Sequence, residues 1–259
     1  MLLNFAEKIL DGFFAFFPRK MPSRLHLSEV CLIAHRGAHD NKLEIIENTD
    51  AAFARALVLG CWGIEFDVHA TADGILVINH DPTLARLWGK NLQISQLNFE
   101  TLRQLVPQIP TLAEVVERYG KRMHLFIELK APFVAEEALK EELKSLRPGE
   151  DYHLLSLDGS LFSTFKSFSP AVLLLVPVHN NVSKFCNLAL QNNYGGVLGH
   201  YLLLNNTKVA QLNLAKKRVG VGMVDSRFGL YRELNRGLTW IFSNNVSVLG
   251  ECIERLKKS

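Results

Sequence analysis

The sequence lacks the features that mark several classes of protein. No stretch reaches the roughly 18 consecutive apolar residues of a membrane-spanning helix, so we expect no transmembrane segment. Blocks of five or more like charges are absent and the net charge is only +3, which argues against a nucleic-acid-binding or polybasic membrane tail. Internal repeats and low-complexity tracts are absent as well. We therefore expect a globular protein whose partner is not a nucleic acid.

Cysteine is scarce, with four residues and no Cys-x-x-Cys pair. Three of the four lie in apolar surroundings, where a small buried thiol is common. Because disulfides form chiefly outside the cytosol, we expect a reduced, cytoplasmic protein. The 259 residues, 48% of them hydrophobic, are enough to bury a core without disulfides or a structural metal. Any metal site should therefore serve chemistry.

The first 17 residues are rich in apolar side chains at helical spacing, among them Phe5, Phe13 and Phe16. Charged residues interrupt this stripe, unlike in a cleaved signal peptide. Two interpretations stay open: a helix that packs on the domain and closes the bottom of a barrel, or an anchor at a membrane surface. We expect an amphipathic segment at 1–25 before one domain at 26–259. The second interpretation adds peripheral membrane contact through residues 1–20.

Short apolar runs alternate with helical patterns from residue 30 onward, which favours a parallel sheet built from βα units. Capping signals support the helices: Thr111 and Glu114 have capping-box spacing before Gly120, and a helix from Asp50 stops at Gly60. Eight strands in this length fit an α/β fold, the (β/α)8 TIM barrel. The expected strands cover residues 30–34, 63–68, 123–129, 152–156, 172–176, 196–198, 219–224 and 239–242.

One further apolar run, residues 75–80, follows the second strand after the dipeptide Asp73-Gly74. Two residues are too few for a parallel crossover, so this run should fold back as an antiparallel hairpin strand. If both turn residues lie in that dipeptide, Asp67 faces His80. A small cap insertion, residues 84–105, follows the hairpin.

Acidic residues stand at the ends of two predicted barrel strands. Glu65 and Asp67 alternate on one strand, so both side chains leave it on the same side. Glu128 and Lys130 repeat the pattern on the next parallel strand. Three carboxylates suit a hard cation such as Mg²⁺ or Ca²⁺ better than Zn²⁺. A buried ion pair would explain one pair alone, but two pairs at the strand ends of a barrel predict a metal site.

Two histidines map to the same end of the barrel. His35 and His80 follow the first strand and the hairpin, and their ordinary pKa near neutrality suits proton transfer. Arg36 and Lys130 supply positive charge for an anionic substrate. This set indicates phosphoryl-ester chemistry. The remaining histidines are expected to be surface or core residues: His26, His39, His69, His124, His153, His179 and His200.

The order and spacing of several short motifs resemble the glycerophosphodiester phosphodiesterase family. The likeness covers about residues 30–255. It implies a TIM barrel that hydrolyses glycerophosphodiesters to glycerol 3-phosphate and an alcohol with a divalent cation. The motifs are Ile33-Ala-His-Arg-Gly37, Glu47-Asn-Thr49, Ile64-Glu-Phe-Asp67, Thr71-Ala-Asp-Gly74 with His80-Asp81, Ile109-Pro-Thr-Leu112 and Ile127-Glu-Leu-Lys130.

The resemblance implies roles for individual residues. His35 and His80 match the family's acid–base pair. It also implies that a neighbouring glycerol hydroxyl attacks phosphorus first, giving a cyclic phosphate that water then opens. The metal ligands that it implies are Glu65, Asp67 and Glu128. Arg36 and Lys130 match positions that contact the phosphate, and Glu47 and Asn48 match supporting loop residues.

Two stretches depart from the family's pattern. Gly222-Met-Val-Asp225 stands where Trp-Thr-Val-Asn is usual, so an aromatic wall is absent. Thr239-Trp-Ile-Phe-Ser-Asn244 stands where Ile-x-Thr-Asp is common. Trp240 lies on a different strand, and we expect it to face the helices rather than replace that wall. A more open pocket would admit a bulkier lysophospholipid-like or sugar-linked diester, or would weaken activity.

The sequence thus predicts a phosphoric diester hydrolase, a metal-dependent glycerophosphodiester phosphodiesterase that acts on a small-molecule substrate with Mg²⁺ or Ca²⁺. Two alternatives stay open. One is lysophospholipase D-type activity on membrane lipids, and the other is a non-catalytic barrel that binds phosphodiesters. The alcohol group of the substrate, the choice of metal and the oligomeric state are not indicated by the sequence.

Overall fold

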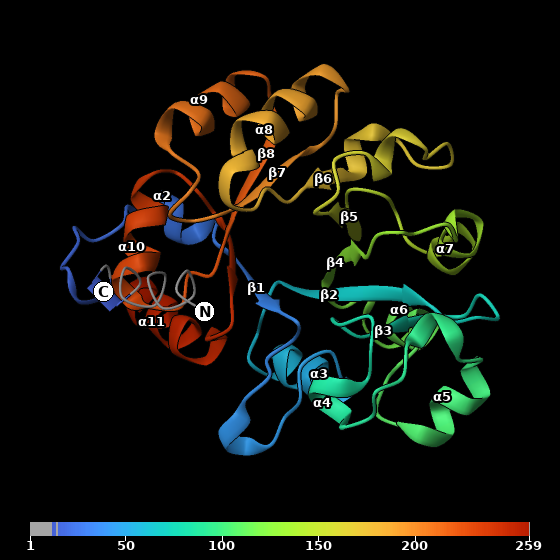
Figure 1. The fold of residues 1–259 in the computed structure, drawn as a ribbon. Helices are drawn as coiled ribbons and strands as arrows, with labels where there is room; N and C mark the ends of the chain where they lie inside the picture. The colour runs from blue at the N-terminus through green and yellow to red at the C-terminus, as the bar shows by residue number, and fades with distance from the viewer. Residues whose placement is uncertain (1–11, 14, 259) are drawn as a thin grey trace.

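A ring of eight parallel strands forms the centre of the computed structural model, which describes residues 12–13 and 15–258 (Figure 1). The strands run in the order β1-β9-β8-β7-β6-β5-β4-β2, and β2 pairs with β1 to close the ring. The predicted strands are confirmed, with ends that differ by at most two residues. The bounds are β1 Cys31–His35, β2 Gly63–Ala70, β3 Leu76–Ile78, β4 His124–Leu129, β5 Tyr152–Ser156, β6 Leu173–Leu175, β7 Gly196–His200, β8 Arg218–Gly222 and β9 Trp240–Ser243.

The hairpin strand β3 pairs antiparallel with β2, as predicted, but the predicted register is wrong by one residue. The backbone N–H of Asn79 donates to the carbonyl of Asp67 at 3.0 Å, so Asn79 and not His80 lies opposite Asp67. The reason is the length of the loop, which has three residues, 72–74, instead of two. Gly74 closes it with φ +83°, a left-handed conformation that suits the last position of a three-residue hairpin loop.

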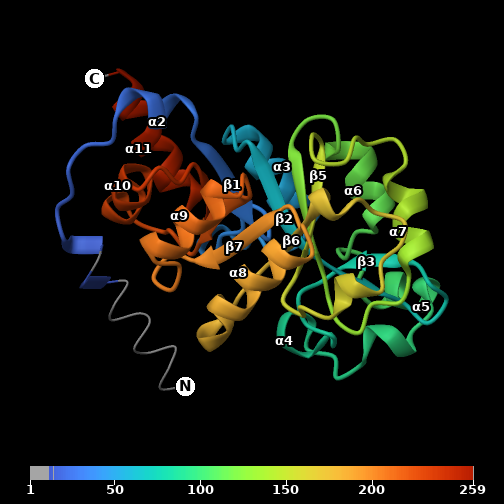
Figure 2. The same cartoon turned by 90° about the horizontal axis from the view of Figure 1, so that it is seen from above.

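Helices surround the barrel, and α2 packs against α10 and α11 (Figure 2). The predicted capping box is confirmed: the Thr111 hydroxyl accepts from the Glu114 N–H, the Glu114 carboxylate accepts from the Thr111 N–H, and Gly120 caps the carboxyl end. The helices are α2 Arg24–Ser28, α3 Asp50–Val58, α4 Ala85–Trp88, α5 Phe99–Leu105, α6 Leu112–Tyr119, α7 Glu136–Leu143, α8 Val182–Gln191, α9 Asn206–Leu214, α10 Arg227–Asn235 and α11 Val246–Lys258. Short 3-10 turns are η1 Asn41–Leu43, η2 Ile94–Gln96, η3 Leu161–Ser163, η4 Pro170–Val172 and η5 His179–Asn181.

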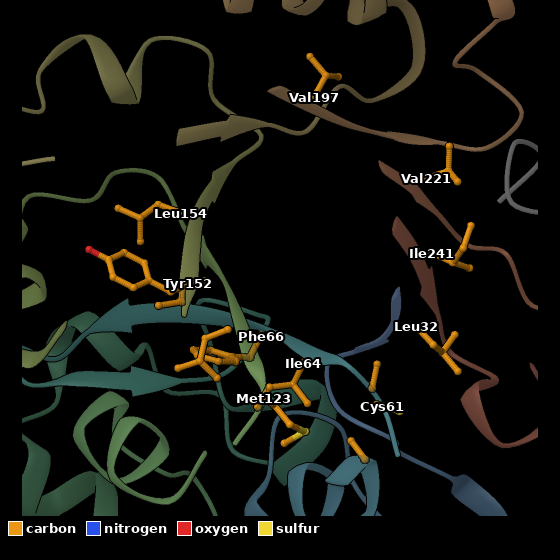
Figure 3. Packing of buried hydrophobic residues seen from close by; sticks show 14 of the residues in the cluster. Leu32, Cys61, Ile64, Phe66, Met123, Tyr152, Leu154, Val197, Val221 and Ile241 are labelled. Carbon is orange, nitrogen blue, oxygen red and sulfur yellow. The ribbon is translucent and has the colours of Figure 1, made fainter. Parts of the chain in front are cut away.

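Apolar side chains fill both sides of the barrel wall. Figure 3 shows members of the outer layer, including Phe66, Val197 and Val221, which pack between the strands and the helices. A separate inner cluster that includes Phe126 and Phe242 fills the ring. The four cysteines are free thiols, and three of them are buried in the outer layer, as predicted.

Trp240 belongs to the inner cluster, so the expectation that it faces the helices is wrong. Its position in β9 has the same parity as that of Phe242, and both side chains therefore point into the ring. The Trp240 ring lies 5.2 Å from those of Phe126 and His153. It packs at the amino-terminal end of the barrel and does not replace the missing aromatic wall at the opposite end.

Two buried histidines share this inner layer. His124 Nε2 lies 2.8 Å from His153 Nδ1, and His124 Nδ1 lies 2.9 Å from the carbonyl oxygen of Glu150. A carbonyl can only accept, so His124 carries its proton on Nδ1 and His153 must donate to His124 Nε2. Burial lowers the pKa of His124 to about 4 and that of His153 to about 3. Both rings are neutral core residues at physiological pH.

The predicted cap comprises α4, η2 and α5 and has a small core of its own. Leu84, Ile94 and Leu102 pack there with Val77 from the hairpin. The cap is thus anchored beside the segment that carries His80.

The predicted amphipathic segment at 1–25 falls partly on residues 1–11 and 14, which lie outside the described part of the chain. Gly12 and Ala15 border a hollow with Met223 and Asp225, at the end of the barrel where β8 ends. Phe16 is 85% exposed. Within the described residues, no helix combines the length and the apolar character needed to span a bilayer.

Candidate active site

Three carboxylates converge at the carboxyl-terminal end of the barrel, as the alternation of side chains predicts. Glu65 and Asp67 come from β2, and Glu128 stands beside Asp67 in the parallel register of β4. One oxygen from each lies within 4.8 Å of the others, and all three residues are buried. Buried carboxylates are costly unless positive charge compensates them, so the neighbouring cations decide the state of this cluster.

Lys130 supplies the nearest positive charge. Its Nζ lies 2.6 Å from Asp67 Oδ1 and also donates to Glu128. Burial opposes ionisation of Asp67, yet Lys130 and then Arg36 hold its pKa well below the ordinary value. Burial also opposes the charge of Lys130, but Asp67 and Glu128 raise its pKa. Lys130 and Asp67 therefore form a stable ion pair at the centre of the site.

The other two acids remain short of positive charge. Burial, and next the charge of Asp67, raise the pKa of Glu65 to about 8 and that of Glu128 to about 7. Three oxygen donors with too little compensating charge are the donor set that a hard divalent cation prefers. Glu65, Asp67 and Glu128 therefore fit a divalent cation.

The turn after β1 brings a backbone donor and a guanidinium to the cluster. Arg36 has φ 55°, and its N–H donates to Glu65 Oε2 at 3.0 Å. Gly37 follows with φ 76°, and a Cβ there would lie 2.8 Å from the Cβ of Ala52, so only glycine fits. Arg36 Nε is buried 3.6 Å from Asp67 Oδ2 and has no hydrogen-bond partner among the described residues. This nitrogen therefore has only the charge of Asp67 beside it among the described residues.

His35 ends β1 beside the acids. Its Nε2 lies 3.8 Å from Glu65 Oε2, and its Nδ1 lies 2.7 Å from Asn244 Oδ1. Burial and then the charge of Arg36 lower the pKa of His35, so its neutral form prevails near pH 7. Asn244 follows β9, at the other end of the chain, and was not predicted as a site residue.

His80 is held by a carboxylate. Its Nδ1 lies 2.8 Å from Asp81 Oδ1, so the proton sits on Nδ1 and Nε2 is left for a substrate. Burial lowers the pKa of His80, and the charge of Asp67 and the bond to Asp81 oppose that shift. Arg86 of the cap donates to Asp81 Oδ2. His80 therefore lies at the site, although the hairpin register differs from the predicted one.

The supporting loop residues lie where the resemblance implies. Glu47 Oε1 accepts from Arg36 at 3.0 Å and from Arg86 at 2.6 Å. Asn48 adopts φ 59°, and its Nδ2 donates to Asp67 Oδ2 at 2.8 Å. All nine predicted site residues are thus brought to one end of the barrel, namely His35, Arg36, Glu47, Asn48, Glu65, Asp67, His80, Glu128 and Lys130.

A cavity of about 150 Å³ opens beside these polar groups. His35, Glu65 and Glu128 line one side, and an apolar wall faces them. A Cβ on Gly222 would meet no atom within 4 Å, so the position of the missing aromatic residue borders open space. The wall comprises Leu155, Val176, Pro177, Val178, Leu198, Met223 and Phe242.

Two of the remaining histidines are not ordinary surface or core residues, contrary to expectation. His39 Nε2 lies 3.3 Å from Asn244 Oδ1, and His200 lines the cavity. His39 lies in the loop after β1 and His200 is the last residue of β7, and sequence spacing alone does not bring these two positions together. His124 and His153 are core residues as expected, and the side chain of His179 lies outside the described part.

Comparison with known proteins agrees with this geometry. The sequence model of the glycerophosphoryl diester phosphodiesterase family matches residues 35–183. A glycerophosphodiester phosphodiesterase of Caldanaerobacter subterraneus is 38% identical over 124 residues, which are 43% of this chain and 50% of that protein. The chain spans about half the length of the curated relatives it matches.

Solved structures share the fold. The glycerophosphodiester phosphodiesterase of Thermotoga maritima superposes with a TM-score of 0.74 at 23% identity, over 86% of this chain and 97% of that one. A phosphodiesterase of Oleispira antarctica, solved with the product sn-glycerol-3-phosphate, gives 0.73 at 25% identity, over 88% and 99%. The fold and the acidic site define a TIM barrel with a candidate divalent-cation centre. The chain belongs to the glycerophosphoryl diester phosphodiesterase family.

Proposed function

We propose that the chain hydrolyses glycerophosphodiesters to glycerol 3-phosphate and an alcohol. One observation carries this proposal: His35 and His80 each have Nδ1 bound to an oxygen acceptor, beside a cluster of three buried carboxylates. Each histidine thus keeps Nε2 for proton transfer. The family and the product-bound relative support the substrate class.

The two histidines have different partners, which suggests different roles. His35 is buried next to Arg36 and bonds a neutral amide, so it is the base that takes the proton of the neighbouring glycerol hydroxyl. His80 bonds the carboxylate of Asp81, which opposes the effect of burial and favours imidazolium, so in that protonated form His80 gives its Nε2 proton to the leaving alcohol. The hydroxyl oxygen attacks phosphorus while the bond from phosphorus to the leaving alcohol breaks. Neutral His80 then takes a proton from water, which attacks the cyclic phosphate, and His35 returns its proton to the glycerol oxygen that leaves phosphorus.

Charge on the phosphate needs compensation. The positively charged side chains of Arg36 and Lys130 bind the nonbridging oxygens in this proposal. Glu65, Asp67 and Glu128 hold a divalent cation, Mg²⁺ or Ca²⁺, which when bound stabilises negative charge on those oxygens.

A mass-spectrometric screen tests the reaction. The purified chain is incubated with a panel of glycerophosphodiesters and either Mg²⁺ or Ca²⁺, and glycerol 3-phosphate is measured. We expect release that stops with EDTA and falls at least 100-fold in His35→Ala and in His80→Ala, with His26→Ala as the matched histidine control. Release unaffected by EDTA and by His35→Ala contradicts the proposal. Binding of diesters without any release favours the non-catalytic barrel.

Lysophospholipid-like diesters at a membrane surface are a second candidate substrate class. The apolar wall of the cavity suits an acyl-bearing alcohol, and Phe13, Phe16 and Phe17 are 58%, 85% and 49% exposed near the same end of the barrel. Exposed aromatic residues on a helical segment suit insertion at a lipid interface. In this reading residues 1–25 dock a separate catalytic domain, 26–259, on the membrane.

Liposome sedimentation tests the docking. The intact chain is compared with a chain that begins at Ser23 and with the triple change of Phe13, Phe16 and Phe17 to Ser. We expect both altered forms to stay in the supernatant while hydrolysis of a water-soluble diester is unchanged. Equal sedimentation of all three forms counts against the anchor.

A further inference from the structure

The residue that holds His35 is itself held in one orientation. Asn244 Oδ1 lies 2.7 Å from His35 Nδ1. The Nδ2 of the same side chain lies 3.3 Å from Asp225 Oδ2 and 3.3 Å from Met223 Sδ. A carboxylate only accepts hydrogen bonds, so the amide nitrogen must face Asp225. The amide oxygen must then face His35.

Asp225 has little freedom to turn. Its Oδ1 accepts from the backbone N–H of Asn244 and from the hydroxyl of Ser243, both at 2.8 Å. A backbone N–H can only donate, so Asp225 Oδ1 must act as its acceptor. Only Oδ2 is left to bind the Asn244 amide.

The contact of a second histidine, His39, agrees with this orientation of the Asn244 amide. His39 Nε2 lies 3.3 Å from Asn244 Oδ1, so two imidazoles converge on one amide oxygen. His39 protonated on Nε2 donates to this oxygen, so the contact agrees with the orientation that Asp225 sets. The local hydrogen-bond pattern around Asn244 is therefore satisfied in one arrangement.

We propose that Asp225 and Asn244 form a positioning relay that sets the tautomer of His35. Asp225 orients the Asn244 carboxamide, and the carboxamide oxygen keeps the His35 proton on Nδ1. Nε2, which lies 3.8 Å from Glu65 Oε2, is thereby left free to take the substrate proton. Asp225 and Asn244 are positioning residues, and the catalytic consequence rests on the proposed function of His35.

Nitrogen NMR of the full chain with ¹⁵N-labelled histidine tests the relay, because ring nitrogen shifts distinguish the two tautomers. In the wild type we expect His35 protonated on Nδ1. Asp225→Asn keeps an oxygen toward the backbone N–H and turns an NH₂ toward Asn244. The Asn244 amide then reverses and presents its own NH₂ to His35, which forces the proton to Nε2.

Activity should follow the tautomer. We expect Asp225→Asn to lower kcat about 10- to 100-fold with KM changed less than about 3-fold, a size typical for groups that orient catalytic or ligating residues. Combining Asp225→Asn with Asn244→Asp restores the acceptor facing His35. This double variant should recover the Nδ1 tautomer and most of kcat. Asn245→Ala is the matched control, because within the described part of the chain the side-chain amide of Asn245 donates to the backbone carbonyl of Asp225 and not to its carboxylate.

Two results overturn the relay: an Nε2-protonated His35 in the wild type, or a double variant no better than Asp225→Asn in tautomer and kcat. Thermal melting and calorimetric titration with Mg²⁺ show that each variant is folded and keeps the acidic cluster. If the wild type releases no glycerol 3-phosphate while the tautomers change as expected, the proposed function fails and the relay stands.

Discussion

Arg86 of helix α4 donates to Glu47 Oε1 at 2.6 Å. The same guanidinium also donates to Asp81, the partner of His80. Glu47 in turn accepts from Arg36, next to His35. A single cap residue therefore ties together the two segments that carry the proposed acid and base.

We expect Arg86→Leu to lower kcat/KM about 10-fold, because Glu47 and Asp81 lose a shared donor and the two loops lose their mutual position. Steady-state kinetics on glycerophosphodiesters measures this effect. Arg103→Leu is the control, since it removes a cap ion pair with Glu114 away from the site. Equal kinetics in both variants would show that the cap does not position the loops.

Lys130→Met should destabilise the protein by about 3–5 kcal/mol, because it removes the nearest counter-ion of buried Asp67 and Glu128. A divalent cation should then restore part of this loss. Urea unfolding with and without 10 mM-scale Mg²⁺ measures both effects. Lys140→Met, at an exposed ion pair, should change stability by less than about 1 kcal/mol. A Lys130→Met protein that Mg²⁺ stabilises no more than the wild type contradicts the assignment of the acidic cluster.

The His124–His153 pair should make the fold acid-sensitive. Burial holds the folded pKa values at about 4 and about 3, whereas unfolded histidine titrates near 6.5. The unfolded state therefore binds more protons between these values, and stability falls as pH drops from about 6.5 toward 4.

Each such histidine adds up to about 1.4 kcal/mol per pH unit to this slope. Unfolding by urea at several pH values should show a shallower slope when His124→Phe and His153→Leu are combined. His26→Gln serves as the control for a histidine outside the barrel interior. An unchanged slope in the double variant would assign the acid sensitivity to other groups.

Gly222→Trp should narrow the cavity, because a side chain at this position projects into open space beside the apolar wall. We expect kcat/KM for acyl-bearing diesters to fall at least 10-fold relative to that for small diesters. Competition assays with both substrates measure the ratio, and Gly222→Ala should leave it within about 2-fold. If Gly222→Trp leaves the ratio of the two kcat/KM values unchanged, the alcohol group of the substrate does not occupy the space beside Gly222.

Local patterns predict the parts of this fold that depend on local physics. The capping box of Thr111 and Glu114 needs only residues three positions apart. The convergence of Glu65, Asp67 and Glu128 follows from strand alternation and from the parallel register. The predicted hairpin register is wrong by one residue, because one extra loop residue shifts every pair of facing residues in β2 and β3. A dipeptide such as Asp73-Gly74 does not fix the loop length.

Local sequence patterns do not predict contacts between segments that are distant in the chain. His35 and Asn244 are 209 residues apart, and Arg86 and Glu47 are 39 apart. Trp240 lies inside the ring because of its strand parity, which depends on where β9 begins. The contact between His35 and Asn244 follows from closure of the ring, where β1 meets β9, and not from spacing along the chain.

Closure of the strand ring also decides when His35 becomes oriented during folding. β1 pairs with β9, so the contact between His35 and Asn244 can form only when the first and last strands of the ring meet. A chain that is still being synthesised, or an intermediate with an open ring, holds the acidic cluster of β2 and β4 but an unoriented His35. The proposed hydrolysis would therefore require completion of the barrel, and refolding followed by turnover should lag behind refolding followed by far-ultraviolet circular dichroism.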